Sequence, residues 1–406
     1  NANYNNGITG KDTLFIQKAS VTVNAVNHGI NGKDSLTIKD ADITVTSGGD
    51  ALRSTNDSDP TLGYLVITGS ALKLTAGEDS IQAETTLTIS GGTATVTTAG
   101  GAGQSISDDT SAKGLKAGTQ VTVTGGTFQL NCCDDAIHSN GDVTISGGSF
   151  TIATGDDGMH ADDTLSISSG TIDITRSYEG LEGAKVLISG GKISIVASDD
   201  GINAAGGSDQ CGSGGFGFAP DAFGSSGDYL IRISGGVVTV NASGDGIDSN
   251  GDIEVTGGEL YISGPTSNGD GTIDCDGSAT ITGGIVVAAG STGMAENFGT
   301  ASTQGSILVN LSGSAGQTIT LKDSDGNILA SFTPAKAFGC VVVSAPGVAQ
   351  GGTYTIAAGG ASTTVTMESL IYGSGMGGPG NMGGPGNIGG GQQPPQGGMG
   401  SPDNRG

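Results

Sequence analysis

The sequence predicts an all-β protein that folds as a right-handed parallel β-helix, a solenoid with about 22 residues per coil. Two observations predict this fold class. Apolar anchor residues recur at a nearly fixed spacing, and runs of alternating apolar and polar residues follow each of them. Alternation with a period of two is typical of strands, and self-similarity every 20–50 residues or so is typical of repeat architectures. No window of useful length shows the periodicity of a helix.

The anchors are mostly Ile or Leu, and each follows small and acidic or amide residues. Five gaps between neighbouring anchors are 22 residues long, and the gap from Leu181 to Ile202 is 21. The regular members of the series are Ile8, Ile30, Leu52, Ile81, Leu115, Ile137, Met159, Leu181, Ile202 and Ile247. Ile273 and Met294 continue the series less perfectly.

About half a period after each anchor, two alternating runs flank a Gly-rich bend, as in LTISGGTATV (87–96) and VTISGGSFTI (143–152). Glycine permits the backbone angles that such a bend requires. A unit of two or three short strands cannot bury its own apolar face, so it must stack on the next unit. Parallel crossovers favour the right hand. A β-propeller, with blades of roughly 40 residues, does not fit this period.

The chain divides into three predicted parts. Residues 1–303 form the parallel β-helix, with a Gly/Ser/Phe insertion at about 207–228. In residues 304–372 the period stops, and alternating strands with a hairpin signal at Asp325–Gly326 indicate a small antiparallel β module. Residues 373–406 are a Gly/Pro/Asn/Gln-rich tail, a composition typical of flexible linkers.

Composition excludes several classes of protein. The 406 residues include 78 Gly and no Trp, which leaves too few large side chains for the thick core of an α/β enzyme. A net charge of −25 excludes a nucleic-acid binder, which needs a basic surface. No apolar run approaches the roughly 20 residues needed to span a bilayer.

The start of the sequence and its cysteines suggest where the protein acts. A sequence that begins with Asn1 rather than Met fits an exported protein whose targeting segment was removed. The five Cys are compatible with an oxidising compartment, although an odd number leaves at least one thiol free or paired between chains. Cys211 is able to reach Cys275, but the pairing stays open. We therefore expect a secreted bacterial protein, extracellular or at the cell surface.

Acidic residues align in columns when the repeats are stacked. Like charges about 5 Å apart repel, so such a column requires protonation or a cation. Ca²⁺ takes six to eight oxygen ligands in flexible geometry, which fits carboxylates beside Gly-rich corners. The alternative is that these acids only end strands and cap turns, with their charges solvated. The predicted Ca²⁺ ligands are Asp134, Asp135, Asp156, Asp157, Glu179, Glu182, Asp199 and Asp200, with Asp245 and Asp248 as a further site.

His138 and His160 stand one period apart, each directly after an anchor. That spacing suits a zinc site or a catalytic base. Because this column is polar throughout, we expect instead a surface pair beside the acids.

Several long strings now resemble a known family. They include DDAIHSNGDVTISGGSFTI, DDGMHADDTLSI, SYEGLEGAKVLISGG, SDDGINAAGGSD, SGPTSNGDGTIDCDGSATITGG and GMAENFG. These strings are similar to secreted bacterial proteins described as calcium-binding, carbohydrate-binding right-handed parallel β-helix proteins, and the resemblance covers roughly residues 5–365. It implies a fold related to β-helical polysaccharide lyases, but binding of acidic and cellulosic polysaccharides rather than cleavage. It also implies calcium ligands at Asp134, Asp135, Asp156, Asp157, Glu179, Glu182, Asp199 and Asp200.

The first coils depart from the family pattern. Asn6, His28 and Lys113 stand where acids are expected, which puts calcium in doubt there.

Three functions remain open. The first is a non-catalytic module in which protein-bound Ca²⁺ bridges to sugar carboxylates. The second is a structural filament subunit, because an uncapped β-helix end exposes strand edges that template head-to-tail homopolymers. A cluster of aromatic residues in or beside the insertion is expected to contact carbohydrate or another subunit, unless it packs under its own loop. Its members are Phe216, Phe218, Phe223 and Tyr229.

The third function is a calcium-dependent, pectate-type polysaccharide lyase, which needs a Lys or Arg base beside the metal. The candidate bases are Lys113, Lys116, Arg176 and Lys185. None of them lies in a recognisable signature, so we expect no enzymatic activity. The discriminating observation is whether one of these amines lies over the calcium site.

Overall fold

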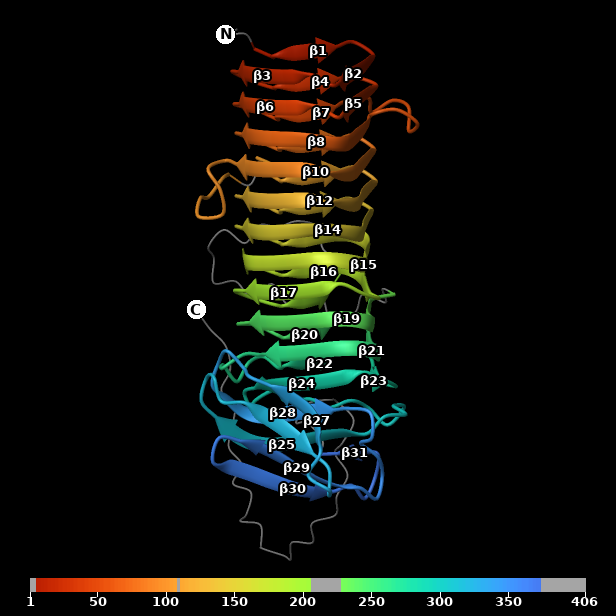
Figure 1. Cartoon of the computed structure of the whole chain (residues 1–406), viewed down its shortest axis with the longest axis vertical. Helices are drawn as coiled ribbons and strands as arrows, with labels where there is room; N and C mark the ends of the chain where they lie inside the picture. The colour runs from red at the N-terminus through yellow and green to blue at the C-terminus, as the bar shows by residue number, and fades with distance from the viewer. Residues whose placement is uncertain (1–4, 108–109, 206–227, 374–406) are drawn as a thin grey trace, which may run out of the picture. The chain divides into compact units, whose positions relative to one another are not determined.

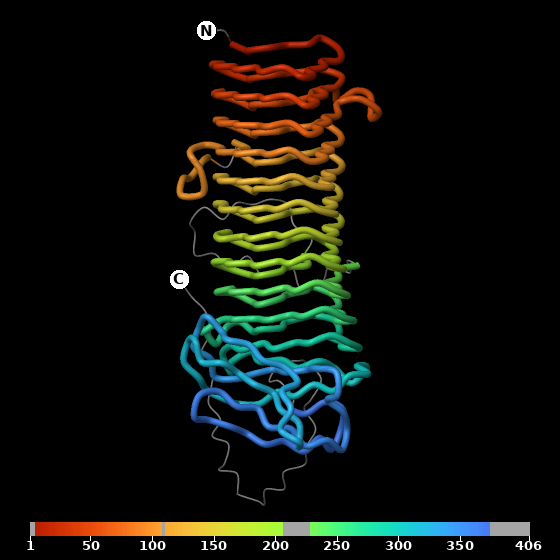
Figure 2. The backbone as a smooth tube through the Cα atoms, viewed as in Figure 1, coloured from red at the N-terminus to blue at the C-terminus, as the bar shows by residue number. Residues whose placement is uncertain are grey.

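The computed structural model describes residues 5–107, 110–205 and 228–373, which form strands and turns with no helix among them. All of them belong to one compact unit, Asn1–Met376. Figures 1 and 2 show coil upon coil from β1 to β24, followed by strands that run in other directions. The all-β class predicted from the sequence is therefore confirmed.

The anchors fall into one column. Ile8 pairs with Ile30, Ile30 with Leu52, and the register continues without a slip to Ile247 and Ile273, always between parallel strands. From Ile30 onward every paired anchor is fully buried. The strands that begin at an anchor are β1 (Ile8–Gly10), β4 (Ile30–Gly32), β7 (Leu52–Ser54), β9 (Ile81–Ala83), β11 (Leu115–Ala117), β13 (Ile137–Ser139), β15 (Met159–Ser177), β16 (Leu181–Ile188), β18 (Ile202–Ala204), β20 (Ile247–Ser249) and β22 (Ile273–Cys275).

The alternating runs form the remaining strands of each coil, also paired in parallel one repeat apart. They are β2 (Thr13–Gln17), β3 (Ser20–Ala25), β5 (Ser35–Lys39), β6 (Asp42–Ser47), β8 (Tyr64–Ala76), β10 (Thr86–Thr98), β12 (Gln120–Cys132), β14 (Asp142–Thr154), β17 (Lys192–Ala197), β19 (Leu230–Ala242), β21 (Asp252–Ser263), β23 (Ala279–Ile281) and β24 (Ile285–Gly290).

The long strands bend where the sequence reads SGG. In β14 the bend lies at Gly147 and Gly148, and Gly148 has a φ of +104°, which L side chains rarely adopt. A Cβ on Gly147 would lie 2.5 Å from the carbonyl oxygen of Thr124 in the preceding coil. Glycine therefore serves both the turn and the close approach of neighbouring coils.

The core is a continuous stack of aliphatic side chains through the coils, because alternate strand positions point inward and the register repeats. Val121, Val143 and Leu165 are each fully buried in successive coils. Phe128 and Phe150 stack with ring centroids 4.6 Å apart and planes 8° apart. Each coil thus buries its apolar face against the next.

The coils end in antiparallel pairing. β28 (Phe338–Ser344) lies between β24 and β25 (Ser306–Gly313) and pairs antiparallel with both. β31 (Ile371–Tyr372) pairs parallel with β25. A separate antiparallel sheet covers a second core in the order β27 (Ile328–Phe332), β26 (Ile319–Lys322), β29 (Thr353–Ala358), β30 (Ala361–Thr366).

Two details of the sequence prediction are decided by these strands. The hairpin predicted at Asp325–Gly326 joins β26 to β27, and Gly326 has a φ of +86°. Met294 lies outside any strand, so among the described residues the anchor register ends at Ile273. Among the described residues, no helix is long and apolar enough to cross a membrane.

Cys132, Cys133, Cys275 and Cys340 are free thiols. Cys211 lies outside the described residues, as do nearly all of the predicted insertion and the tail from residue 374.

Candidate functional site

The residues two positions before each anchor form a ladder of hydrogen bonds from coil to coil. The Asp135 Oδ1 atom accepts a hydrogen bond from the backbone N–H of Asp157 at 3.0 Å. Asp157 Oδ1 accepts one from the N–H of Glu179 at 3.2 Å, and Asp200 Oδ1 accepts one from the N–H of Asp245 at 2.5 Å. One oxygen of each carboxylate thus accepts a hydrogen bond from the backbone N–H of the equivalent residue in the next coil. This explains why side chains with acceptor atoms recur in this column.

The same ladder exists where the sequence departs from acids. The Nδ1 atom of His28 accepts a hydrogen bond from the N–H of Asp50 at 3.1 Å, and Asn6 Oδ1 accepts one from the N–H of His28 at 3.4 Å. Burial and the charge of Arg53 lower the pKa of His28 to about 4, so its ring is neutral at pH 7. In the first coils, a neutral side chain therefore accepts the hydrogen bond that a carboxylate accepts in the later coils.

Lys113 supplies a positive charge to the first predicted acidic pair. Its Nζ atom lies 3.0 Å from Asp134 Oδ1 and 2.5 Å from Asp135 Oδ2, and all three side chains are buried. Burial acts to raise the pKa of Asp135, but Lys113, with His138 and His160, holds it well below its usual range. Lys113 therefore already offsets part of the negative charge of Asp134 and Asp135.

The prediction that His138 and His160 form a surface pair is wrong. Each is only 2% exposed, and their ring centroids lie 5.0 Å apart. The register of β13 and β15 places them side by side, and the acids pack around them because each carboxylate lies three residues before its His. The His138 Nδ1 atom lies 3.0 Å from Asp135 Oδ2.

His160 is an ion-pair centre. Its Nδ1 atom lies 2.7 Å from Glu182 Oε2 and 3.2 Å from Asp157 Oδ2, and its Nε2 atom lies 3.3 Å from Asp162 Oδ1. Burial alone lowers the pKa of His160, but hydrogen bonds to Asp157 and Glu182 raise it to about 12. The ring is therefore an imidazolium at neutral pH and compensates the carboxylates around it.

Further along the column the acids repel one another. Burial and the neighbouring Asp245 and Glu179 raise the pKa of Asp200 to about 10. Burial, Asp248 and Asp274 raise the pKa of Asp245 to about 8, against the hydrogen bond from the N–H of Gly271. Burial and Glu182 likewise raise the pKa of Glu179 to about 8, although Asn203 donates to both its oxygens. Without a cation, carboxyl groups in this stretch of the column therefore keep their protons at neutral pH, because their ionised forms would repel one another.

The structure brings three predicted ligands together at this place. Asp200, Asp245 and Asp248 each present an oxygen within 4.8 Å of the others. All three side chains are half-buried. They lie in neighbouring coils because Ile202 pairs with Ile247, which sets Asp200 beside Asp245.

Two other predicted sets are also close but contain or adjoin cations. Asp134, Asp135 and Asp156 present oxygens within 4.8 Å of one another, beside Lys113. Asp157 and Glu182 meet around His160 within the same limit. Asp199 is half-buried, and its hydrogen bond with the phenol of Tyr178, together with burial, raises the pKa of Tyr178.

Tyr178 was not singled out in the sequence. Its side chain is 44% exposed and stands beside Asp199 and Glu179. The signal was its position, one residue before Glu179 in the acidic column. An exposed ring at this place is a surface on which a sugar can stack.

Of the four predicted aromatic contacts, only Tyr229 lies within the described residues. It is half-buried and packs against the core. Phe216, Phe218 and Phe223 lie outside the described residues.

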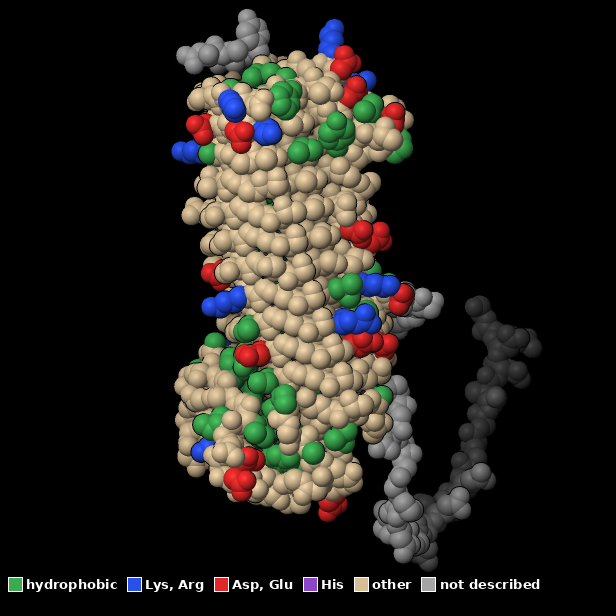
Figure 3. Space-filling view, turned by 45° about the vertical axis from the view of Figure 1, so that its right-hand side comes forward, with side chains coloured by type: hydrophobic (Ala, Val, Ile, Leu, Met, Phe, Trp, Pro, Cys, Tyr) green, Lys and Arg blue, Asp and Glu red, His purple; other side chains and the backbone are tan. Residues whose placement is uncertain are grey.

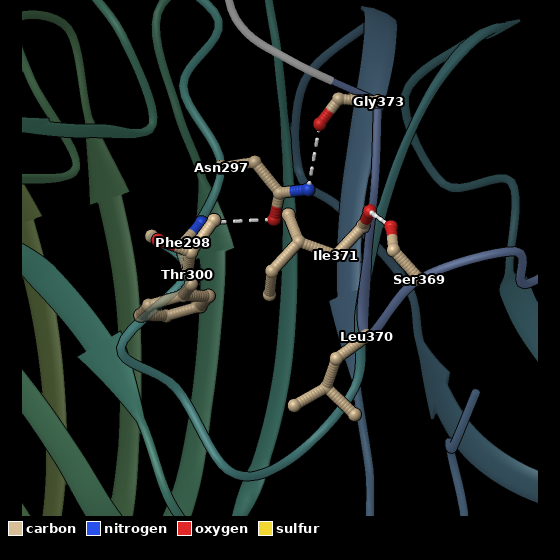
Figure 4. A pocket seen from close by; sticks show the side chains of 8 residues that line it. Asn297, Phe298, Thr300, Ser369, Leu370, Ile371 and Gly373 are labelled. Atoms are coloured by element: carbon tan, nitrogen blue, oxygen red, sulfur yellow. Dashed lines mark hydrogen bonds between the residues drawn. The ribbon is translucent and has the colours of Figure 1, made fainter.

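Two cavities open at other parts of the surface. One, of about 410 Å³, lies over β7, β9 and β11, and the described residues that line it are polar or charged; of these, the sequence analysis had named only Lys116 as a candidate functional residue. The other, of about 650 Å³, is shown in Figure 4. There Asn297 donates to the carbonyl oxygens of Tyr372 and Gly373, and Phe298 is only 1% exposed, so its ring offers no stacking platform.

The face shown in Figure 3 carries its acids singly or in small groups, and the middle coils there are covered mainly by uncharged polar side chains and backbone. On this face, charged side chains are therefore sparse over the middle coils.

The comparisons with known proteins point to one function class. No curated protein matches the chain, and no solved structure does. A protein-family model described as carbohydrate-binding domain-containing protein matches residues 1–158 and 156–377. These matches cover most of the chain and indicate binding of carbohydrate. The chain therefore belongs to the family of carbohydrate-binding domain-containing proteins.

Proposed function

We propose that this protein is a secreted, non-catalytic right-handed parallel β-helix at the bacterial cell surface that binds acidic polysaccharide through Ca²⁺. Its family indicates the carbohydrate. The calcium is supported by one observation: Asp200, Asp245 and Asp248 present oxygens within 4.8 Å of one another, where burial and the neighbouring acids raise the pKa of Asp200 to about 10. The metal would supply a positive charge that accepts further oxygens from a sugar carboxylate.

The donor set fits Ca²⁺. Two oxygens bound to one ion at 2.3–2.6 Å or so lie at most about 5 Å apart. The three oxygens lie within 4.8 Å of one another, and all are hard carboxylate donors. A cation would also remove the repulsion that raises the pKa values of Asp200 and Asp245.

The proposal does not extend to every predicted ligand. Lys113 stands between Asp134 and Asp135, and His160 between Asp157 and Glu182, so these acids already have cations. A divalent ion there would have to displace them. Glu179 and Asp199 lie next to the proposed site, since both act on the pKa of Asp200.

Tyr178 completes the binding surface. Its exposed ring lies beside Asp199, at the edge of the acidic stretch. A uronate whose carboxylate reaches the bound Ca²⁺ would stack its ring on this phenol. The anionic protein can bind an anionic polymer in this way because the metal reverses the local charge.

The lyase alternative is less well supported. β-Elimination needs a free amine beside the metal. Lys113 is committed to Asp134 and Asp135, Lys116 pairs with Asp79, and Lys185 pairs with Asp228. Arg176 lies exposed on β15. The contacts of these lysines favour binding without cleavage.

Asp245→Asn tests the proposal. The asparagine oxygen can still accept the hydrogen bond from the N–H of Gly271, so the corner keeps its geometry while the site loses one charge. We expect calcium affinity, measured by isothermal titration calorimetry, to fall on the order of 100-fold, because affinity follows the number of charged ligands. Binding of polygalacturonate in calcium should fall with it.

The matched control is Asp173→Asn, which removes an exposed carboxylate on β15 away from the corner. Unchanged calcium affinity in Asp245→Asn would refute the site. Release of unsaturated uronate ends by the wild-type protein would establish the lyase instead.

Head-to-tail self-association stays a prediction, and sedimentation velocity with and without calcium is its measurement.

A further inference from the structure

The cavity over β7, β9 and β11 is built from charged and hydroxyl-bearing side chains of three neighbouring coils. The anchor register sets Arg53 beside Gln82, and Gln82 beside Lys116. The volume of about 410 Å³ falls within the range of roughly 300–1,000 Å³ that is usual for small-ligand sites. The remaining lining residues are Asp50, Thr55, Glu78, Asp79, Glu84, Thr110 and Ser111.

Both basic residues of this cavity are already paired. The Arg53 Nη1 atom lies 3.2 Å from Asp50 Oδ2, and the Lys116 Nζ atom lies 3.2 Å from Asp79 Oδ2. Lys116 also donates to the hydroxyl of Ser111 at 2.8 Å. These pairs hold the two cations against the walls and cancel the charges of Asp50 and Asp79.

Two carboxylates remain. Within the described part of the chain, no ion pair joins Glu78 or Glu84 to Lys, Arg or His at 4.0 Å or less, and Gln82 Nε2 donates a long hydrogen bond of 3.5 Å to Glu84 Oε2. Both side chains are half-buried. The negative charge acts on the neighbours: burial, then Asp79 and Glu78, raise the pKa of Asp50 to about 6 against the pull of Arg53.

This arrangement selects one kind of ligand. A sugar carboxylate would meet a net negative wall. A bare divalent ion held by His28, Asp50 and Glu78, whose ligand atoms lie within 4.8 Å of one another, would stand beside Arg53 and would leave Glu84 and the hydroxyl groups of the cavity unused. A ligand with an ammonium group would pair this group with Glu78 and Glu84. If the group stands on a sugar ring, the ring hydroxyls would form hydrogen bonds with Arg53, Gln82 and Lys116.

We propose that this cavity binds a cationic amino sugar, a glucosamine-type unit of a polysaccharide, without calcium. The sugar part of this inference rests on the proposed polysaccharide binding, but the site and the charge of the ligand differ. The protein would then bind sugars of opposite charge at two sites. A uronate would bind through Ca²⁺ at Asp200, Asp245 and Asp248, and an amino sugar would bind in the cavity over β7, β9 and β11.

The test is calorimetric titration of the full chain in chelator with two probes, the hexamer of glucosamine and the hexamer of N-acetylglucosamine. We expect the glucosamine hexamer to bind at least about tenfold more tightly, since acetylation removes the ammonium charge. Glu78→Gln and Glu84→Gln should each weaken it about five- to tenfold, and the exposed Glu368→Gln should not. Binding should also weaken as salt rises.

Equal affinity for the two hexamers, or unchanged affinity in both Gln variants, would overturn the inference. So would displacement of the glucosamine hexamer by millimolar calcium, which would identify the cavity as a metal site. Both variants replace half-buried side chains, and a thermal melt verifies that they fold. The calcium site is tested separately, by measuring polygalacturonate binding to Asp245→Asn in calcium. Either proposed site can therefore be refuted without refuting the other.

Discussion

In the absence of calcium, the free energy of unfolding should fall by about 3–5 kcal/mol between pH 6.5 and pH 9. The cause is the crowded stretch of carboxylates that ends in Asp200 and Asp245. Burial and mutual repulsion raise their pKa values to about 10 and about 8, and that of Glu179 to about 8. Each tenfold change in an acid constant is worth about 1.4 kcal/mol, which we discount because these groups interact.

The sign follows from proton binding. In the unfolded chain these carboxylates ionise near their ordinary pKa values of about 4, whereas in the folded protein they keep their protons to higher pH. The folded state therefore binds more protons, and stability falls as pH rises toward the folded values. His160, with its pKa raised to about 12, acts in the same direction above pH 6.5.

Burial also raises the pKa of Asp157 well above its usual range and that of Glu296 to about 7, so both act in the same direction, whereas the following groups act outside this window. Asp135 and Glu182 have lowered pKa values, so their contribution is lost only on acidification. His28, whose pKa is lowered to about 4, contributes below pH 6.5.

Urea unfolding at a series of pH values, with chelator and with 1 mM calcium, measures the effect without the screening that guanidinium would add. Calcium should remove most of the slope. A site with a Kd of about 10 μM would return about 2.7 kcal/mol at that concentration. Asp200→Asn should raise stability at pH 9 in chelator, because the amide keeps the hydrogen bond from Asp245 without the charge.

The exposed Asp173→Asn is the matched control and should change little. A stability that is flat from pH 6.5 to 9 in chelator would show that the corner carboxylates are not mutually destabilising. The case for a cation there would then fail with it.

The fold was predictable because its signal is periodic. The spacing of Ile137, Met159 and Leu181 fixes which residues pair, and the observed register follows that spacing. Where the period is interrupted, prediction weakened. Met294 continues the spacing from Ile273, but the chain there turns into the antiparallel strands and forms no further coil.

The site was only partly predictable, because charge compensation depends on three-dimensional neighbours. The sequence aligned Asp135 with Asp157, but it did not show that the Lys113 side chain turns along the column to reach Asp134 and Asp135. Polarity alone suggested that His138 and His160 were exposed. Hydrogen bonds to the neighbouring carboxylates allow them to be buried, a distinction that no single-residue scale contains.

The second large effect is expected from Lys113→Met, which should cost about 3–5 kcal/mol of unfolding free energy. Met preserves the length and most of the packing of a side chain that is 4% exposed, but it removes the ammonium between Asp134 and Asp135. Two buried carboxylates would then face each other, with His138 as a remaining partner of Asp135. The exposed Lys192→Met is the control and should change stability by less than about 0.5 kcal/mol.

A double mutant separates lost charge from lost packing. If the cost comes from unpaired charge, adding Asp135→Asn to Lys113→Met should recover part of the stability, since the amide still accepts the hydrogen bond from the N–H of Asp157. If the cost comes from packing, the two substitutions should simply add. Additive losses measured by urea unfolding would contradict the view that Lys113 acts through its charge.

The same variant tests why calcium is proposed at one corner of the column and not at another. Without the ammonium, Asp134, Asp135 and Asp156 retain oxygens within 4.8 Å of one another, which is the spacing proposed to bind Ca²⁺ at Asp200, Asp245 and Asp248. Calcium should therefore stabilise Lys113→Met more than the wild type, and titration should show one additional site. No additional binding would mean that carboxylate spacing alone does not define a site on this column, and that the acids around Asp200 need a further feature to hold the ion.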